Sequence, residues 1–242
     1  DSIEERNLNR IVNSHREDAY VRRPKVEAMA RAIAAMGFGT DVEIIHANLA
    51  TPAAVKAVAE CDVVFGCMDG VEGRHLLNRL SSYYLQPYFD VGVRLDADGK
   101  GGIDEACGAV HYLRPDRSTL QDRLVYTTAQ LKAAGLQRTD AKAYREQLRV
   151  GYIHGVEVDR PAVISINMQM ESIAVNEYLA RLHPYRHDDN AASGIVRVSF
   201  IQGTEYRERE PAPSGMVAAH IGKGDVDPLL SMPELSEPGE AA

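Results

Sequence analysis

The run DVVFGCMDGVEGRHLLNRLSSYYLQPYFDVGVRL at residues 62–95 contains the pattern that decides the fold. Its first part, residues 62–66, is a short apolar run, which is typical of a strand buried on both faces of a sheet. Residues 71–85 are predicted to form a helix, and residues 88–95 a second strand. A strand, a helix and a strand joined by short loops predict an α/β sheet.

The segment that precedes this run shows the same alternation. Residues 24–36 are predicted to form a helix, since Pro24 suits the first helical position and Gly37 suits a stop. Residues 41–46 are predicted to form a strand, and residues 51–60 a second helix. The predicted fold class is therefore α/β, with a doubly wound Rossmann-like sheet over roughly the first 100 residues.

The remainder of the chain predicts a C-terminal α+β extension. It is expected to contain a turn over residues 98–102, a strand ending near residue 113, and helical or irregular structure over residues 118–150. Residues 162–182 are expected to begin as a strand and to continue as a helix that ends before Pro184. A hairpin is expected over residues 194–207. Beyond residue 210 the chain is rich in proline, glycine and acidic residues, so a poorly packed, poorly ordered tail is expected.

The composition narrows the class of protein. The chain has 242 residues, of which 45% are hydrophobic and 26% charged, as in a soluble globular protein. A net charge of -8 disfavours nucleic acid as the main partner. No run approaches the roughly 18 apolar residues of a membrane span, and no secretory leader is evident, so a cytoplasmic location without membrane contact is expected.

The three cysteines, Cys61, Cys67 and Cys107, show no CxxC spacing. An odd number without that spacing argues against a disulfide framework and against a four-thiolate zinc site. Reduced thiols are expected, with Cys61 and Cys67 as small core residues.

Four side chains of the first seventy residues suggest a site for a polyphosphate and a metal ion. Arg10 can bind phosphate oxygens through two N–H groups, and Lys25 can place a point charge on the same group. Asn7 can donate to a phosphate or sugar oxygen. Asp69 follows an apolar strand, where open α/β sheets bind ligands, and its carboxylate suits Mg²⁺.

Each of these residues also has an ordinary structural interpretation. Arg10 could be a surface arginine in a loop, and Asp69 could cap the helix that begins near residue 71, a role compatible with metal binding. Lys25 at a helix start is poorly placed for the helix dipole, which favours a functional role over a solvated one.

In their order and spacing these residues resemble the ThiF/MoeB family, the bacterial relatives of ubiquitin-activating enzymes. The resemblance rests on Asp1, on the motif Asn-Leu-Asn-Arg at residues 7–10, on Lys25 and on Asp69. The run DGVEGRHLLN at residues 69–78, which contains Arg74, Leu77 and Asn78, adds to it. The match covers roughly residues 1–115 well and continues loosely to residue 182.

The resemblance implies a function. Members of the family use ATP and Mg²⁺ to adenylate the C-terminal carboxylate of a ubiquitin-like protein or peptide, usually as homodimers. Such a reaction brings one anion to another, so the site must neutralise charge. By this resemblance Arg10, Lys25 and Asp69 would be catalytic, Asn7 would join them in binding ATP, and Asp69 would hold Mg²⁺. The late helix, with Met168 and Met170 expected to be exposed, is a candidate dimer interface.

The sequence also departs from the family pattern. The family's phosphate loop, Gly-x-Gly-Gly-x-Gly, would precede Asp1, so residues 1–115 are expected to be an N-terminally truncated adenylation domain. Residues 116–210 would continue that domain with crossover helices, the late helix and the hairpin, and residues 211–242 would be the tail. Residues 115–122 lack the family's zinc thiolates, so no zinc is expected. No cysteine lies where the family forms a thioester, which favours adenylation alone, or sulfur or amine transfer to an external acceptor, over a thioester on this chain.

Two other functions compete with this one. A ThiF-like module that only binds or dimerises would explain the missing loop, zinc ligands and thiol. An NAD- or FAD-binding Rossmann protein would share the sheet but would give no use to the ordered set of asparagine, arginine, lysine and aspartate.

Overall fold

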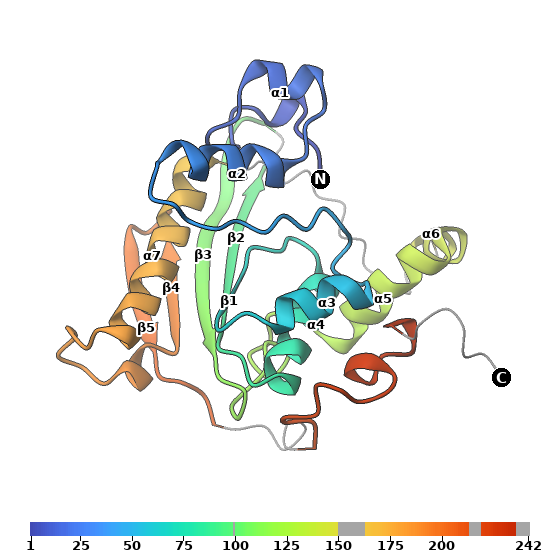
Figure 1. Cartoon of the computed structure of the whole chain (residues 1–242), viewed down its shortest axis with the longest axis vertical. Coiled ribbons are helices and arrows are strands. Elements are labelled where there is room, and N and C mark those ends of the chain that lie inside the picture. The colour runs from blue at the N-terminus through green and yellow to red at the C-terminus, as the bar shows by residue number, and fades with distance from the viewer. Residues whose placement is uncertain (99, 150–162, 213–218, 236–242) are drawn as a thin grey trace.

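A five-stranded mixed sheet lies at the centre of the computed structural model, which describes residues 1–98, 100–149, 163–212 and 219–235 (Figure 1). The strands are consecutive in the sheet, in the order β1 (Val64–Gly66), β2 (Tyr88–Ala97), β3 (Ile103–Leu113), β4 (Ile195–Ser199) and β5 (Thr204–Glu208). The pair β1–β2 is parallel, and the three pairs that follow are antiparallel. The predicted α/β class is confirmed.

Two of the helices, α3 (Pro52–Ala59) and α5 (Thr128–Thr139), directly follow a threonine whose side chain caps them. The side chain of Thr51 accepts a hydrogen bond from the Ala54 N–H, and Thr127 and Gln130 form a capping box. The helices are α1 (Arg16–Tyr20), α2 (Lys25–Ala35), α3 (Pro52–Ala59), α4 (Val71–Tyr83), α5 (Thr128–Thr139), α6 (Ala141–Arg149) and α7 (Ile164–Leu182). Short 3-10 turns are η1 (Glu5–Asn7), η2 (Asn190–Ser193), η3 (Leu229–Ser231) and η4 (Pro233–Leu235).

Most of the predicted elements are confirmed. The helices predicted before residue 90 correspond to α2, α3 and α4, and the strands predicted at residues 62–66 and 88–95 correspond to β1 and β2. Asp98 accepts hydrogen bonds from the backbone N–H groups of Lys100 and Gly102 in the turn between β2 and β3, in which residue 99 lies outside the described residues. The predicted late hairpin is β4–β5, and the region before it contains α5, α6 and α7.

Three local predictions are wrong. Residues 41–46 form no strand, because no described strand lies beside them to share hydrogen bonds, and their apolar side chains stay partly exposed. The strand β1 is not buried on both faces, since it is at the edge of the described sheet and Phe65 is 39% exposed. The late segment is already helical at Ile164, while residue 162 lies outside the described residues.

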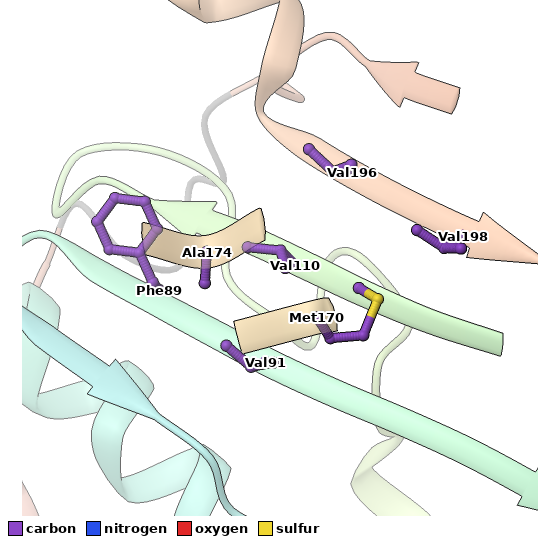
Figure 2. Close-up of a cluster of buried hydrophobic side chains, with 7 residues drawn as sticks. All are labelled: Phe89, Val91, Val110, Met170, Ala174, Val196 and Val198. Carbon is purple, nitrogen blue, oxygen red and sulfur yellow. The ribbon is translucent and has the colours of Figure 1, made fainter. Parts of the chain in front are cut away.

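One face of the sheet packs against α7 (Figure 2). This core cluster takes alternate residues from three strands and two residues from the helix: Phe89, Val91, Val110, Val196, Val198, Met170 and Ala174. Figure 2 shows Met170 and Ala174 directed at the strands. The packing corrects one expectation, because Met170 is fully buried while Met168 is exposed. Residues two apart on an α-helix point to nearly opposite sides, so the sheet covers Met170 and leaves Met168 exposed.

The other face packs against α4 and, through α4, against the C-terminal region. Leu80 and Tyr83 of α4 share a cluster with Leu230 and Leu235, which are buried. Arg79 also donates to the backbone carbonyl of Leu230, 3.1 Å from its Nε. The expectation of a poorly packed tail is therefore wrong for η3 and η4, because a few leucines among prolines and acidic residues are sufficient to anchor the chain. The three-part division of the chain stays a prediction.

No helix within the described ranges is both long enough and apolar enough to cross a membrane.

Candidate functional site

Asp69 lies in the loop between the end of β1 and the start of α4. Its side chain is exposed, and within the described residues it makes no ion pair or hydrogen bond. The N-cap residue of α4 is Gly70, so the interpretation of Asp69 as the helix cap is wrong. An exposed carboxylate without a competing cation, at the carboxyl end of a parallel strand, suits a Mg²⁺ ion that also binds phosphates.

Two residues of the run at 69–78, Arg74 and Asn78, form hydrogen bonds with the backbone of two loops that lie beside α4. Arg74 donates from Nε to the backbone carbonyl of Met68, 2.9 Å away. One turn later, the Oδ1 atom of Asn78 accepts from the backbone N–H of Leu120 at 3.0 Å. Residues four apart on a helix share a face, so this spacing presents both side chains to the loops. The sequence marked these residues as part of a motif, but it did not reveal these roles.

A buried polar group lies on the α4 side of the sheet, beside the loop of Asp69. Asp90 is fully buried and pairs in register with Gly66, the last residue of β1. The Tyr88 hydroxyl donates to Asp90 Oδ1 at 2.8 Å, and Arg74 Nη1 lies 3.6 Å from Oδ2. Burial raises the pKa of Asp90, which the charge of Arg74 only partly offsets.

His111 faces Asp90 across the β2–β3 pair and is also buried. Burial, reinforced by the charges of Arg123, Arg197 and Arg74, lowers the pKa of His111 to about 3, so its imidazole is neutral at physiological pH. Burial likewise lowers the pKa of Arg123 to about 10. Sequence reasoning missed this group, although an aspartate and a histidine with apolar neighbours on both sides were a usable signal.

The other three predicted ligands lie in the N-terminal segment. Asn7 is mostly buried, and its Oδ1 accepts from the backbone N–H of Glu4 at 2.9 Å. Lys25 Nζ forms an ion pair with Asp1 at 2.9 Å. Arg10 is exposed, and its guanidinium has no partner in the described chain. Arg10 is therefore open to a ligand, whereas Lys25 is in an ion pair and the side-chain oxygen of Asn7 is in a hydrogen bond within the chain.

A buried carboxylate organises this N-terminal segment. Arg31 binds Asp18 through two nitrogens, each 2.7 Å from a carboxylate oxygen, and Arg23 Nε donates to the same group at 2.7 Å. The hydrogen bonds from Arg31 above all hold the pKa of Asp18 well below its usual range. Sequence reasoning did not identify this network.

The two parts of the predicted site are not joined by contacts. No hydrogen bond or ion pair between described residues links Asp69 to Asn7, Arg10 or Lys25. Figure 1 shows why: α1 and α2 lie at the end of the molecule toward which β2 runs, whereas β1 pairs only with the first residues of β2. A shared ligand would have to reach both places, so the grouping of the four residues stays a prediction.

A shallow surface pocket of about 320 Å³ adjoins the loop of Asp69 at the start of α4. Its lining comes from the start of α4 and the second half of α5: Gly70, Val71, Glu72, Ala134, Gln137 and Arg138. Arg138 Nε lies 3.0 Å from Glu72 Oε1, so the charges of the pocket neutralise each other. The pocket offers no free cation for a phosphate.

The cysteines do not lie where they were expected. Cys61 and Cys67 are exposed, which corrects their interpretation as core residues: one follows the last turn of α3 and the other the end of β1. Although the residue reaches solvent, partial desolvation raises the pKa of the Cys67 thiol, and the charges of Glu171 and Asp90 raise it further. A thiol of this kind is a weak nucleophile at neutral pH.

The sequence profile of the ThiF family matches residues 1–199. The chain belongs to the ThiF family. The resemblance found in the sequence is thereby confirmed. No curated protein matches the chain significantly.

Solved structures of E. coli MccB share the fold of this ThiF-family chain. MccB with ATP aligns with a TM-score of 0.60 and 13% identity, over 89% of this chain and 55% of MccB. MccB in complex with N-formylated MccA, named there as the Microcin C7 biosynthetic enzyme, aligns with a TM-score of 0.63 and 13% identity, over 89% of this chain and 57% of MccB. MccB with MccA-N7isoASN aligns with a TM-score of 0.64 and 14% identity, over 88% of this chain and 56% of MccB.

Identities this low establish the fold and nothing finer. The chain spans about half the length of the MccB chains that it matches. Neither of the two competing functions gains support from these matches.

Proposed function

We propose that the protein containing this chain adenylates the C-terminal carboxylate of a peptide or ubiquitin-like protein, using ATP and Mg²⁺. The observation that carries the proposal is Asp69: an exposed carboxylate, unpaired within the described residues, at the end of a parallel strand in a ThiF-family fold. A structural neighbour with ATP and another with N-formylated MccA support a nucleotide and a peptide as the first ligands to test.

The proposed roles follow from the local geometry. Asp69 would hold Mg²⁺, which would offset the negative charge of the phosphates. Arg10 would contact phosphate through its open guanidinium, and Lys25 would exchange its ion pair with Asp1 for the same purpose. Asn7 would contribute its amide N–H groups, because its oxygen is occupied by Glu4. Loss of one preorganised group of this kind typically raises the barrier by about 3 kcal/mol.

We also propose that the protein is a homodimer and that α7 contributes to the interface. Four apolar side chains on the outer side of α7 are between 37% and 53% exposed: Met168, Val175, Leu179 and Leu182. Their spacing of seven, four and three residues places them along one stripe of the helix. Exposed apolar stripes of this kind are typical of protein interfaces.

The activity is tested by ATP–pyrophosphate exchange with the protein that contains this chain, using a panel of peptides and ubiquitin-like proteins as carboxylate substrates. We expect exchange with at least one substrate and a loss of about 100-fold in Asp69→Ala. The matched control is Asp188→Ala, which removes another exposed aspartate and should leave the rate unchanged.

Two outcomes would overturn the assignments separately. If no substrate supports exchange and calorimetry detects no ATP binding, the adenylation proposal is wrong. If exchange occurs and survives Asp69→Ala, the activity stands but the metal assignment does not.

A further inference from the structure

Arg74 connects the loop that carries Asp69 to the strand β2. Its Nε donates to the backbone carbonyl of Met68 at 2.9 Å, and its Nη2 donates to the backbone carbonyl of Val91 at 3.4 Å. Its Nη1 lies 3.6 Å from Asp90 Oδ2. One guanidinium thus touches the loop before α4, the backbone of β2 and a buried carboxylate.

The backbone of β2 is shaped to admit this guanidinium. A Cβ atom added at Gly92 would lie 2.6 Å from Arg74 Nη2, closer than two such atoms can approach. Glycine inside a strand weakens the strand and often marks a close approach of another group. The glycine at this position is therefore explained by the passage of Arg74 over β2.

The burial of Asp90 is also explained by the position of Arg74. Asp90 is fully buried in the middle of the sheet, where an ionised carboxylate costs stability. Its Oδ1 accepts from the Tyr88 hydroxyl, while its Oδ2 has no hydrogen bond and faces Arg74. An apolar residue would stabilise the sheet better, so the carboxylate is best understood as the counter-ion that holds Arg74 in place.

The contact with Met68 bears directly on Asp69. The Met68 carbonyl and the Asp69 N–H belong to one planar peptide unit. A hydrogen bond that fixes this carbonyl therefore also fixes the start of the Asp69 backbone and the direction from which its side chain leaves.

We propose that Arg74 is a positioning residue that holds the loop of residues 67–70 against β2 and thereby aims the carboxylate of Asp69. Asp90 acts as the counter-ion of the guanidinium, and Gly92 leaves the space that the guanidinium occupies. The metal-binding half of this inference rests on the proposed function, whereas the holding of the loop does not. Lysine cannot replace Arg74, because one ammonium group cannot reach three acceptors in a fixed fork geometry.

Loop order is measured first, on the 242-residue chain without any ligand, by NMR order parameters of the backbone amides of residues 68–70. A rigid backbone gives a value near 0.85 and a flexible one a value below about 0.6. We expect Arg74→Lys to lower the values of these amides from the first range to the second. The matched control is Arg79→Lys, on the same helix, which loses its contact with Leu230 and should leave these amides rigid.

A second variant guards against a general loss of folding. Gly92→Ala keeps the guanidinium but displaces it from β2, and it should loosen the same amides while circular dichroism shows an unchanged fold. If residues 68–70 stay as rigid in both variants as in the parent, the inference is overturned.

The functional half is tested by the Mg²⁺ dependence of ATP–pyrophosphate exchange in the protein that contains this chain. Arg74→Lys should raise the Mg²⁺ concentration for half-maximal rate about tenfold, and saturating Mg²⁺ should restore most of the rate. Asp69→Ala should not recover at any Mg²⁺ concentration. A loosened loop with an unchanged Mg²⁺ dependence would overturn the aiming of Asp69. If the unsubstituted protein shows no ATP–pyrophosphate exchange, the proposed function is overturned, but the NMR result on the loop still stands.

Discussion

The two faces of the central sheet are built from alternate residues of the same strands, and both hold an apolar cluster, yet their buried strand residues differ in polarity. Toward α7 the strands present apolar side chains such as Phe89, Val91 and Val110. Toward α4, their immediate neighbours are Tyr88, Asp90 and His111, which are buried as well. A strand directs successive side chains to opposite faces, so one short sequence can build a packed core and a polar interior at once.

Each face also buries a carboxylate, and the two carboxylates differ in how well they are paired. Near α7, Glu177 binds Arg186 and Arg181 at 2.6 Å and 2.8 Å and also binds Arg207. Burial alone would raise the pKa of Glu177, but these hydrogen bonds outweigh it and lower the pKa. For Asp90 the balance is reversed, and burial prevails. The carboxylate near α7 therefore has three arginine partners, whereas Oδ2 of Asp90, beside the candidate site, has no hydrogen bond within the described chain.

The largest effect should come from the apolar face. Phe89→Ala removes a buried ring that packs against the rings of Phe65, Tyr112 and Tyr178. It should lower the free energy of unfolding by about 3–5 kcal/mol, measured by urea denaturation. The control Phe38→Ala truncates a phenylalanine that is 86% exposed. If both variants lose the same free energy, the α7 face is not the main source of stability.

The second effect concerns the well-paired carboxylate. Glu177→Gln removes the anion shared by three arginines, of which only Arg207 keeps another ion pair within the described residues, with Glu205. It should cost about 3 kcal/mol at pH 7. The lowered pKa means that this stabilisation is complete above the pKa of the unfolded chain and is lost as the pH falls through the folded pKa. Urea denaturation at pH 7 and at pH 3 measures both. Glu171→Gln, an exposed site on α7, should change neither value.

The third effect comes from the histidine of the polar face. The pKa of His111 is lowered to about 3, so below pH 6.5 the unfolded chain takes up a proton that the folded chain refuses. Stability is therefore lost as the pH falls from 6.5, by up to about 1.4 kcal/mol per pH unit. In His111→Gln this part of the pH dependence should disappear, whereas the exposed His183→Gln should keep it. Equal slopes between pH 7.5 and 5.5 in all three proteins would show that His111 is not held neutral.

The smallest effect should come from Asp90, and it contrasts most directly with Glu177. Because the pKa of Asp90 is raised, its favourable contribution exists only below the unfolded pKa and is lost as the pH rises through the folded pKa. Asp90→Asn removes a carboxylate whose charge is disfavoured by burial, but it also leaves Arg74 without its counter-ion. These effects oppose each other, so the free energy of unfolding should change by less than about 1 kcal/mol. A loss as large as that of Glu177→Gln would remove the distinction between the two faces.

The local elements were largely predictable from the sequence, and the predicted site only in part. Caps, proline positions and apolar spacing located α2, α3 and α4 and the strands between them. Asp69 was correctly placed at the end of β1. The same reasoning assigned a strand to residues 41–46, which have no partner strand among the described residues, and placed Met170 at the surface, where the sheet in fact covers it.

Residue type and spacing were enough for the α/β class and the family, because caps and apolar periods act between residues a few positions apart. They could not reveal the Arg74–Asp90 pair, the burial of Leu230 against α4, or the burial of Asp18 between Arg23 and Arg31. Each of these depends on which segments distant in the chain meet, and on whether a charge is left in water or enclosed. Burial changes the energy of a charged group far more than any property of its neighbours in sequence.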